Sequence, residues 1–475
     1  MTDLLVRLVW VVNAVTLSYF TILATFYLVS SLLAFRFLRR YALRLKSIDV
    51  EDLISSGAAP PVALLVPAHN EERSCVESVR ALLTLNYPEY EVIVVNDGST
   101  DRTLDVLIEA FDLVRTTRLP SAELPTQPIR RILRSQRHTN LWVVDKENGG
   151  KSDALNAALC ICRTPLFCTI DADSILEPDA LLRATRPFLE DDRVIAVGGI
   201  VRVVNGSTVE QGRVRSVRLS PRLLPRLQVV EYLRAFLSAR VAWSELNASL
   251  IVSGAFGLFR RDMVVAAGGY STTTVGEDME LIVRLHRTQR TRDFVPRVVF
   301  VPDPVAWTEC PETLGGLARQ RNRWQRGLLE SLGRHRRLLF NPRYGAVGML
   351  AYPYFLVLEG FGPVIEIVGY VAFAVTLLIG AWSPTFVVSF MALAVLVGIA
   401  LSAAAVALEE LTFRRYPRWV DLLRLFTAAI VENLGYRQLN QLWRLQGTIA
   451  VLRGQRHWGS PPRRGFGRTT DASAA

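Results

Sequence analysis

Two long stretches of the chain carry no charged residue, and they limit its fold more than any other feature. One runs from Leu8 to Phe35 and the other from Ile367 to Leu408. A helix that crosses a bilayer needs about 20 apolar residues, so we expect one span in the first stretch and two in the second. The sequence "GAWSP", Gly380 to Pro384, is a natural turn between these two. The first stretch is too long for a signal-peptide core and lacks a small-residue cleavage site, so we expect it to be retained.

Basic residues beside these stretches predict how the chain is oriented. The end of the first span is crowded by Arg36, Arg39, Arg40, Arg44 and Lys46. By the positive-inside rule, the polar region that follows lies in the cytoplasm. Two further spans return the chain to that side, where the basic tail Arg453 to Arg468 also belongs, so we expect Trp419 to Val451 to be interfacial or re-entrant. The sequence therefore predicts a multi-pass protein of the inner cell membrane with its main polar domain in the cytoplasm.

The net charge of +11 and the pI near 9.7 fit two classes of partner. Nucleic acid is one, but in a membrane protein the expected partners of basic side chains are anionic lipid headgroups. We therefore expect membrane lipids and no nucleic acid. The five cysteines include one C-x-C but no paired C-x-x-C metal spacing, so we expect thiols in a reducing cytosol.

From Pro61 onward, short apolar runs alternate with amphipathic segments. The runs predict strands over Val62–Pro67, Tyr90–Val95, Leu141–Asp145 and Leu166–Ile170, with helices beginning near Glu72, Thr103, Ser152 and Asp179. Continuous apolar strands separated by helices are typical of an α/β fold with a mostly parallel sheet covered on both faces. The polar connection Thr116–Asn140 is expected to be a surface insertion.

Asp, Asn and Gly gather in the loops that directly follow these four strands. The loops are "AHNEE" (Ala68 to Glu72), "NDGSTD" (Asn96 to Asp101), "KENGGKSD" (Lys146 to Asp153) and "DADS" (Asp171 to Ser174). Ligands of open α/β sheets bind at the carboxyl ends of the strands. Four polar loops on that edge therefore predict a binding site.

The chemistry of these loops suits a nucleotide and a metal. Oxygens of Asp171 and Asp173, with a diphosphate, would complete the octahedral shell that Mg²⁺ or Mn²⁺ prefers. Asp97 can accept a hydrogen bond from a uracil imide, the two glycines of "NGGKSD" would let the backbone approach phosphates, and Lys151 would neutralise them. The alternative for each motif is a turn that merely caps the next helix, as we expect for Asp101.

Two later segments carry further candidates. "GED", Gly276 to Asp278, opens a helix, so one carboxylate can cap it while the other serves as a general base; capping alone is the alternative. In "RQRNRWQRG", Gln320, Arg323 and Trp324 share one helix face. Arg323 can bind a diphosphate and Trp324 can stack on a sugar, and the alternative is membrane anchoring only.

Two acids lie beside the second apolar stretch. Glu359 and Glu366 are seven residues apart, hence on one helix face. Acids at membrane depth are costly and tend to line polar paths. The alternative is a position at headgroup level.

Taken in order, "VPAHNEE", "VVNDGSTD", "NGGK", "DADS", "GED" and "QRNRW" resemble the motifs of the membrane-bound family 2 glycosyltransferases. That group includes the cellulose, hyaluronan, chitin and poly-N-acetylglucosamine synthases. The resemblance covers about residues 61–326 and the flanking spans. It implies a Rossmann-like GT-A domain, a nucleotide-diphosphate sugar donor, a divalent metal and inversion at the anomeric carbon.

The resemblance assigns catalytic and acceptor roles. Asp278, beside Glu277, would deprotonate the acceptor hydroxyl. The Q-x-x-R-W element, which supports the diphosphate and the acceptor end, corresponds to Gln320, Arg323 and Trp324. The acceptor site would be lined by Ser253, Gly254 and Trp324.

The resemblance also assigns the donor site. Asp171 and Asp173 would hold the metal. The nucleotide and its diphosphate would be bound by Pro67, Asn70, Glu71, Asp97, Lys151, Asp171 and Asp173. Two positions depart from the family pattern: Gly276 stands where a Thr usually precedes Glu-Asp, and Asn96 stands where an acid usually begins D-D-G.

The expected function is that of a hexosyltransferase that moves a sugar from a UDP-sugar to a growing polysaccharide, by repeated transfer and with β linkage. A single-transfer enzyme acting on a lipid or lipid-linked acceptor would share every motif. A non-catalytic nucleotide or glycan sensor is a remote alternative.

This interpretation divides the chain into five regions. Residues 1–45 form a transmembrane helix with its basic flank, and residues 46–312 form the cytoplasmic GT-A domain. Residues 313–345 form amphipathic interfacial helices, residues 346–410 two transmembrane helices, and residues 411–475 an interfacial or re-entrant region with a basic tail.

Overall fold

The computed structural model describes residues 2–45, 57, 59–210, 212–291, 293–416 and 418–454. The chain divides into two compact units. Of the described residues, those within 2–45, 219–249 and 310–454 form the helical unit, and those within 57–218 and 250–309 form the sheet unit. The basic tail after residue 454 lies outside the described residues.

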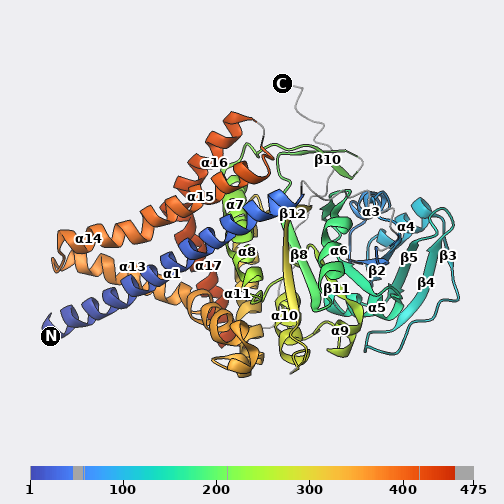
Figure 1. Ribbon diagram of the computed structural model, residues 1–475, viewed down its shortest axis with the longest axis horizontal. Helices are drawn as coiled ribbons and strands as arrows, with labels where there is room; N and C mark the ends of the chain where they lie inside the picture. Colours follow the sequence, from blue (N-terminus) through green and yellow to red (C-terminus); the bar gives the residue numbers. More distant parts are fainter. Residues whose placement is uncertain are drawn as a thin grey trace. The chain divides into compact units, whose positions relative to one another are not determined.

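The sheet unit contains a ten-stranded mixed sheet in the order β3-β4-β5-β2-β1-β6-β11-β8-β12-β7 (Figure 1). Its centre is parallel and consists of β5 (Leu141–Lys146), β2 (Tyr90–Asp97), β1 (Val62–Ala68) and β6 (Leu166–Thr169). These are the four strands that the apolar runs predicted. Ala63, Leu64 and Leu65 are each 0% exposed, so β1 is covered on both faces. The predicted α/β class with a mostly parallel sheet is confirmed.

The remaining strands extend the sheet on both sides. Strand β11 (Gly257–Arg260) runs antiparallel between β6 and β8 (Val194–Val203), and β8 pairs in parallel with β12 (Arg297–Thr308). The short strand β7 (Ile175–Leu176) closes that side. Strands β9 (Thr208–Glu210) and β10 (Arg213–Ser216) form a separate hairpin.

Among the described residues of the sheet unit, the four helices expected after the central strands are α3 (Cys75–Leu82), α4 (Thr103–Phe111), α5 (Lys151–Ile161) and α6 (Ala180–Glu190). Helix α10 (Glu277–Thr288) is the one that "GED" was expected to open, and α9 (Arg261–Ala266) was not predicted. Helices α5, α9 and α10 pack on one face, where Leu155, Val264 and Leu281 join Leu65 and Phe167 in one core cluster. The starts of α5 and α10 bring Lys151 and Glu277 to helix N-termini.

The connection Thr116–Asn140 is not simply a surface insertion. It contains β4 (Ile129–Ser135), which pairs antiparallel with β5 and with β3 (Leu113–Arg115). The strand buries Ile132 and Leu133, while Arg130 and Arg134 are exposed. High polarity concealed this strand, because these two residues are its only buried apolar side chains.

The helical unit contains long apolar helices. Two candidate spans, Leu4–Tyr41 within α1 (Thr2–Leu45) and Pro384–Thr412, are long and apolar enough to cross a membrane. The pair Val347–Gly360 and Gly362–Leu378, bent by 44°, makes a third candidate if it is one span. Between α13 (Gly362–Leu378) and α14 (Pro384–Met391) the chain turns at Gly380, and the Ser383 hydroxyl accepts from the Phe386 N–H at 3.2 Å. This turn lies in "GAWSP". Helix α15 (Val397–Thr412) completes the second candidate span.

Residues 219–249 correct the predicted boundary of the 46–312 domain, because they belong to the helical unit. They form α7 (Leu223–Leu233), the π-helical turn η1 (Arg234–Arg240) and α8 (Val241–Glu245). Arg234 Nη1 lies 2.8 Å from Glu432 Oε1, and the Trp243 ring stacks on Phe26 with centroids 5.0 Å apart. These contacts join positions some 200 residues apart in sequence, which local patterns do not reveal.

The last described helices are α16 (Trp419–Val431) and α17 (Arg437–Leu452). Trp419, Leu423, Phe426 and Ile430 are exposed at helical spacing, so α16 presents an apolar stripe. That stripe suits an interfacial helix. The position of this region relative to a membrane stays a prediction.

Glu359 and Glu366 each pair with an arginine of α17. Arg444 Nη2 lies 3.0 Å from Glu359 Oε2, and Arg437 Nη2 lies 3.5 Å from Glu366 Oε1. The two arginines, like the two acids, are seven residues apart. The acids lie on either side of the 44° bend, so α17 connects both arms of the bent pair. Within the helical unit these carboxylates are therefore ion-paired side chains, and Glu366 is 1% exposed.

Candidate active site

Three charged side chains meet at the carboxyl edge of the central strands in the sheet unit. Lys151 is the first residue of α5, Asp171 follows β6, and Glu277 is the first residue of α10. Lys151 Nζ lies 2.7 Å from Asp171 Oδ1 and 3.2 Å from Glu277 Oε1. The ammonium therefore joins "NGGK", "DADS" and "GED", three motifs that the sequence placed at one site.

Asp278 is held beside this cluster by backbone donors. Its Oδ2 accepts a hydrogen bond from the Gly254 N–H at 3.2 Å, and its Oδ1 accepts one from the Met279 N–H at 2.8 Å. A Cβ at Gly254 would lie 3.1 Å from Lys151 Nζ and 3.5 Å from Asp278 Oδ2. The loop before β11, predicted to line the acceptor site, thus lies against both the lysine and the candidate base.

The charges of the cluster shift the pKa values of two of its members. Burial and the neighbouring Asp171 carboxylate raise the pKa of Asp173 from 3.8 to about 7. Burial lowers the pKa of Lys151, but Asp171 and Glu277 outweigh it, so the pKa is raised and the ammonium stays protonated. Among the described residues, no group of three or more His, Cys, Asp or Glu side chains that could hold a metal ion is found, and Asp171 is paired with Lys151. The Mg²⁺ or Mn²⁺ site at Asp171 and Asp173 therefore stays a prediction.

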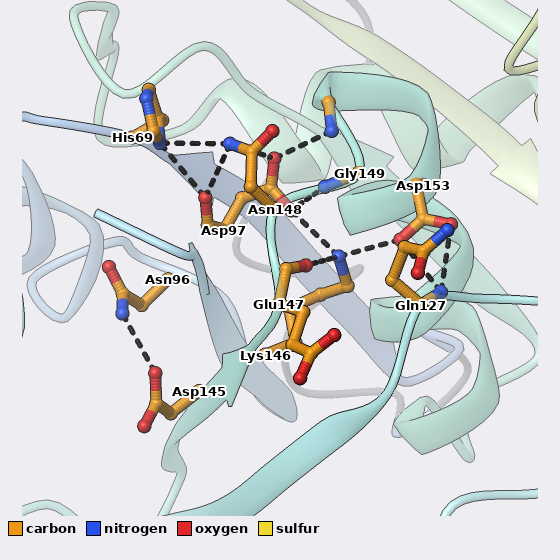
Figure 2. A network of polar contacts seen from close by, with 11 residues as sticks. His69, Asn96, Asp97, Gln127, Asp145, Lys146, Glu147, Asn148, Gly149 and Asp153 are labelled. Atoms are coloured by element: carbon orange, nitrogen blue, oxygen red, sulfur yellow. Dashed lines mark hydrogen bonds and ion pairs between the residues drawn. The ribbon is translucent and has the colours of Figure 1, made fainter. Parts of the chain in front are cut away.

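Asp97 has different surroundings from those we expected. Its side chain is 4% exposed, and both oxygens accept from the chain itself (Figure 2). Oδ1 accepts from Lys146 Nζ at 2.7 Å and from the Gly149 N–H at 3.0 Å, and Oδ2 accepts from the Gly150 N–H at 2.8 Å. The anion cradled by the two glycines is therefore this carboxylate. Contact between Asp97 and a uracil stays a prediction that these hydrogen bonds disfavour.

The other expected nucleotide ligands lie in the adjacent loop after β1. Asn70 is exposed, and its Oδ1 accepts from the Thr100 N–H at 2.8 Å, whereas Glu71 is buried and accepts from the Ser74 hydroxyl at 2.8 Å. Pro67 lies within β1. Asn70 can still reach a ligand, while Glu71 shapes the start of α3.

Asn96 departs from the family pattern for a reason that the structure supplies. It is buried, and its Nδ2 donates to Asp145 Oδ1 at 2.9 Å. Arg131 Nε lies 3.0 Å from the other oxygen of Asp145. An acid at position 96 would place two carboxylates side by side.

Gln320, Arg323 and Trp324 lie on α11 (Leu314–Arg334), which belongs to the helical unit. Trp324 is 44% exposed, and the Arg321 guanidinium lies over its ring, 4.3 Å from the centroid. Arg321 is buried, and its Nη2 lies 2.8 Å from Glu231 Oε2, which also accepts from the Tyr436 hydroxyl at 2.8 Å. Sequence reasoning missed Arg321, although its place three residues before Trp324 was a signal. This arginine orients the tryptophan and does not face lipid.

Replacement of Arg321 by Met is expected to lower the stability of the helical unit. It leaves Glu231 without its cation, and breaking such a buried pair costs about 3 kcal/mol. Thermal unfolding of the full chain in detergent, followed by circular dichroism, measures the change. Arg319→Met is the matched control, because Arg319 is exposed on the same helix. Equal melting temperatures for the two variants would contradict the assignment.

Comparison with known proteins decides the family. The model of the glycosyltransferase-like family 2 matches residues 60–327, more than half of the chain. The chain belongs to glycosyltransferase family 2. This family accounts for the motifs that converge in the sheet unit and for their order along the sequence.

Curated relatives within family 2 include polysaccharide synthases. The poly-beta-1,6-N-acetyl-D-glucosamine synthase of Staphylococcus epidermidis is 26% identical over 266 residues, covering 56% of this chain and 54% of that protein. The synthase of the same name from Staphylococcus aureus strain COL is 26% identical over 314 residues, covering 66% of this chain and 64% of that protein. The matches thus span less than two thirds of these relatives.

A solved structure supports the fold. The mannosyltransferase from Pyrobaculum calidifontis in complex with GDP-Man and Mn²⁺ aligns with a TM-score of 0.51 and 21% identity, covering 89% of this chain and 99% of that chain. At this identity the likeness concerns the fold alone. The expected GT-A fold is confirmed.

Proposed function

We propose that this family 2 glycosyltransferase transfers a sugar from a UDP-sugar to a growing polysaccharide, with inversion at the anomeric carbon, β linkage and repeated transfer. The observation that carries the proposal is the cluster of Lys151, Asp171 and Glu277 with Asp278 beside it. It combines a cation, a metal-type acid and a candidate base. The polysaccharide synthases among the relatives support the choice of product.

In the proposed reaction, the acceptor hydroxyl attacks the anomeric carbon while the nucleoside diphosphate leaves. Asp278 takes the hydroxyl proton, since two backbone N–H groups hold its carboxylate in place. Lys151 stabilises the negative charge that develops on the leaving diphosphate. A divalent cation at Asp171 and Asp173 would supply further stabilisation of that charge. Following the family resemblance, Gln320, Arg323 and Trp324 are proposed to support the diphosphate and the acceptor end.

The proposed location is the inner membrane, with the sheet unit in the cytoplasm. The candidate spans and their basic flanks support this orientation. A cytoplasmic domain would meet the nucleotide sugars of the cell directly. Protease protection of the sheet unit in sealed, right-side-out vesicles tests the orientation.

The activity is tested by incubating purified membranes with a panel of UDP-sugars and Mg²⁺ or Mn²⁺. We expect UDP release with one donor and a ladder of long glycans. A single added sugar on a lipid would instead favour the single-transfer alternative. Neither transfer nor sugar-nucleotide hydrolysis with any UDP-sugar would contradict the proposal and favour a sensor.

A further inference from the structure

A fully buried lysine lies beneath the loop that leads to the active-site cluster. Lys146, the last residue of β5, is 0% exposed. Its Nζ lies 2.7 Å from Asp97 Oδ1 and 2.6 Å from Asp153 Oδ1, and it donates to the Glu147 carbonyl at 2.5 Å (Figure 2). An ammonium has three N–H donors, so all of them are used. Lys146 therefore has no donor left for a ligand.

The carboxylate of Asp97 links Lys146 to the loop between β5 and α5. Besides Lys146, its carboxylate accepts from the backbone N–H groups of Gly149 and Gly150 and from Asn148 Nδ2, at 3.0, 2.8 and 3.3 Å. A carboxylate has about four acceptor positions, and these four donors fill them. The N–H groups that precede α5, which we expected to approach phosphates, are thus held by an internal anion.

Asp153 is the second carboxylate that contacts Lys146, and it also accepts hydrogen bonds from the backbone at Gln127. It lies in the first turn of α5, and both of its oxygens accept from the Gln127 N–H, at 3.2 and 3.1 Å. A Cβ at Gly98 would lie only 2.6 Å from the Asn148 backbone nitrogen. The residue at position 98, in the loop after β2, therefore has to lack a Cβ, because the loop after β5 packs against it there.

We propose that Lys146 is a positioning residue for the donor site, an inference that rests on the proposed function. By holding Asp97 and Asp153 together, it fixes the N-terminus of α5. Lys151 is the first residue of that helix and directly follows Gly150, whose N–H is bound to Asp97. The buried network thereby aims Lys151 at Asp171 and Glu277, where it meets the diphosphate of the donor.

The contacts of Lys146, Asp97 and Asp153 are better explained by positioning of Lys151 than by a contribution to stability alone. A buried ion triad is a weak source of stability, because desolvation offsets much of the Coulomb attraction. It does define geometry, since each charge has a single set of partners at short distance. When the groups of an active site are displaced by about 1 Å, the enzyme loses much of its catalytic rate or its affinity for the substrate.

The test uses the full chain in detergent and compares Lys146→Met with Lys146→Arg, which can still bridge two carboxylates. For Lys146→Met we expect the KM for the UDP-sugar to rise about tenfold or more and kcat to fall as well, because Lys151 also stabilises the charge that develops on the leaving diphosphate. Hydrogen exchange of the Gly149 and Gly150 amides should accelerate. Lys146→Arg should restore the KM to within about threefold of the wild type. Glu147→Gln is the matched control, because its exposed side chain lies outside the network.

Other outcomes overturn the inference. Unchanged KM in a folded Lys146→Met variant would do so, and so would activity that falls only with the folded fraction. If Lys146→Met does not fold, the variant Asp153→Asn is tested in its place, because it leaves the Asp97–Lys146 pair intact. Asp153→Asn should raise the KM for the UDP-sugar by less than Lys146→Met would. An unchanged KM in Asp153→Asn would also contradict the inference. Failure of the proposed function can be told apart from failure of this inference. If the proposed function is wrong, the wild type binds no UDP and transfers no sugar. Hydrogen exchange of the Gly149 and Gly150 amides still reports in that case whether Lys146 holds the loop.

Discussion

Replacing Asp278 by Asn is expected to lower turnover by about 10²–10⁴-fold, the contribution typical of a general base, while UDP binding is retained. Asn has nearly the shape of Asp, and its oxygen can still accept from the Gly254 or Met279 N–H. The loop against Lys151 should therefore stay in place. What is lost is the ability to take the proton of the acceptor hydroxyl. Turnover with saturating UDP-sugar and UDP affinity by calorimetry measure the two effects separately.

The matched control for this variant is Asp262→Asn. Asp262 is an exposed acid that pairs with Arg260, outside the cluster. It should leave both turnover and UDP affinity unchanged. Turnover of Asp278→Asn near the wild-type rate would exclude Asp278 as the base and leave Glu277 as the neighbouring candidate.

Replacing Asp173 by Asn is expected to weaken binding of Mn²⁺ and to reduce transfer by about 10²-fold or more, because a neutral amide is a poor ligand for a hard cation. Manganese affinity is read directly by electron paramagnetic resonance, without the reaction. Since the pKa of Asp173 is about 7, a proton competes with the cation below that pH. Wild-type affinity should therefore fall as the pH is lowered from 8 to 6, and more steeply than in the variant.

Asp179→Asn is the control for the metal experiment. Asp179 lies just before α6, six residues after Asp173, and its carboxylate accepts a hydrogen bond from Asn86 Nδ2 at 3.0 Å. It is therefore a nearby acid with a partner of its own outside the active-site cluster. It should bind Mn²⁺ as the wild type does. Equal affinities for Asp173→Asn and the wild type would contradict the assignment of the metal ligand.

The central strands and the active-site edge were predictable from the sequence because their signals are local. Each buried parallel strand is a short apolar run, as in Leu141–Lys146, and each ends in a polar loop. The topology of an α/β sheet then brings such loops to one edge. This is why Lys151 and Asp171 could be assigned to one edge before their 2.7 Å contact was known. Glu277, which lies 3.2 Å from Lys151 Nζ, was assigned to the site only by the family resemblance.

What the sequence did not reveal depends on partners far along the chain. Asp97 looks like a ligand in "NDGSTD", but its partners lie some 50 residues later, at Lys146 and the two glycines. A lysine at the end of an apolar strand gave no local sign that two carboxylates would bury it. Likewise, Arg234 is an ordinary basic residue until its contact with Glu432 places residues 219–249 in the helical unit.

The two ion pairs of α17 have a consequence for how the protein is made. Glu359 and Glu366 leave the ribosome before Arg444 and Arg437, so both acids enter the growing structure without their counter-ions. Because α17 contacts both arms of the broken helix pair, its ion pairs can contribute to the angle between the arms only after α17 has been translated and docked. That contribution is therefore made late in the synthesis of the described chain.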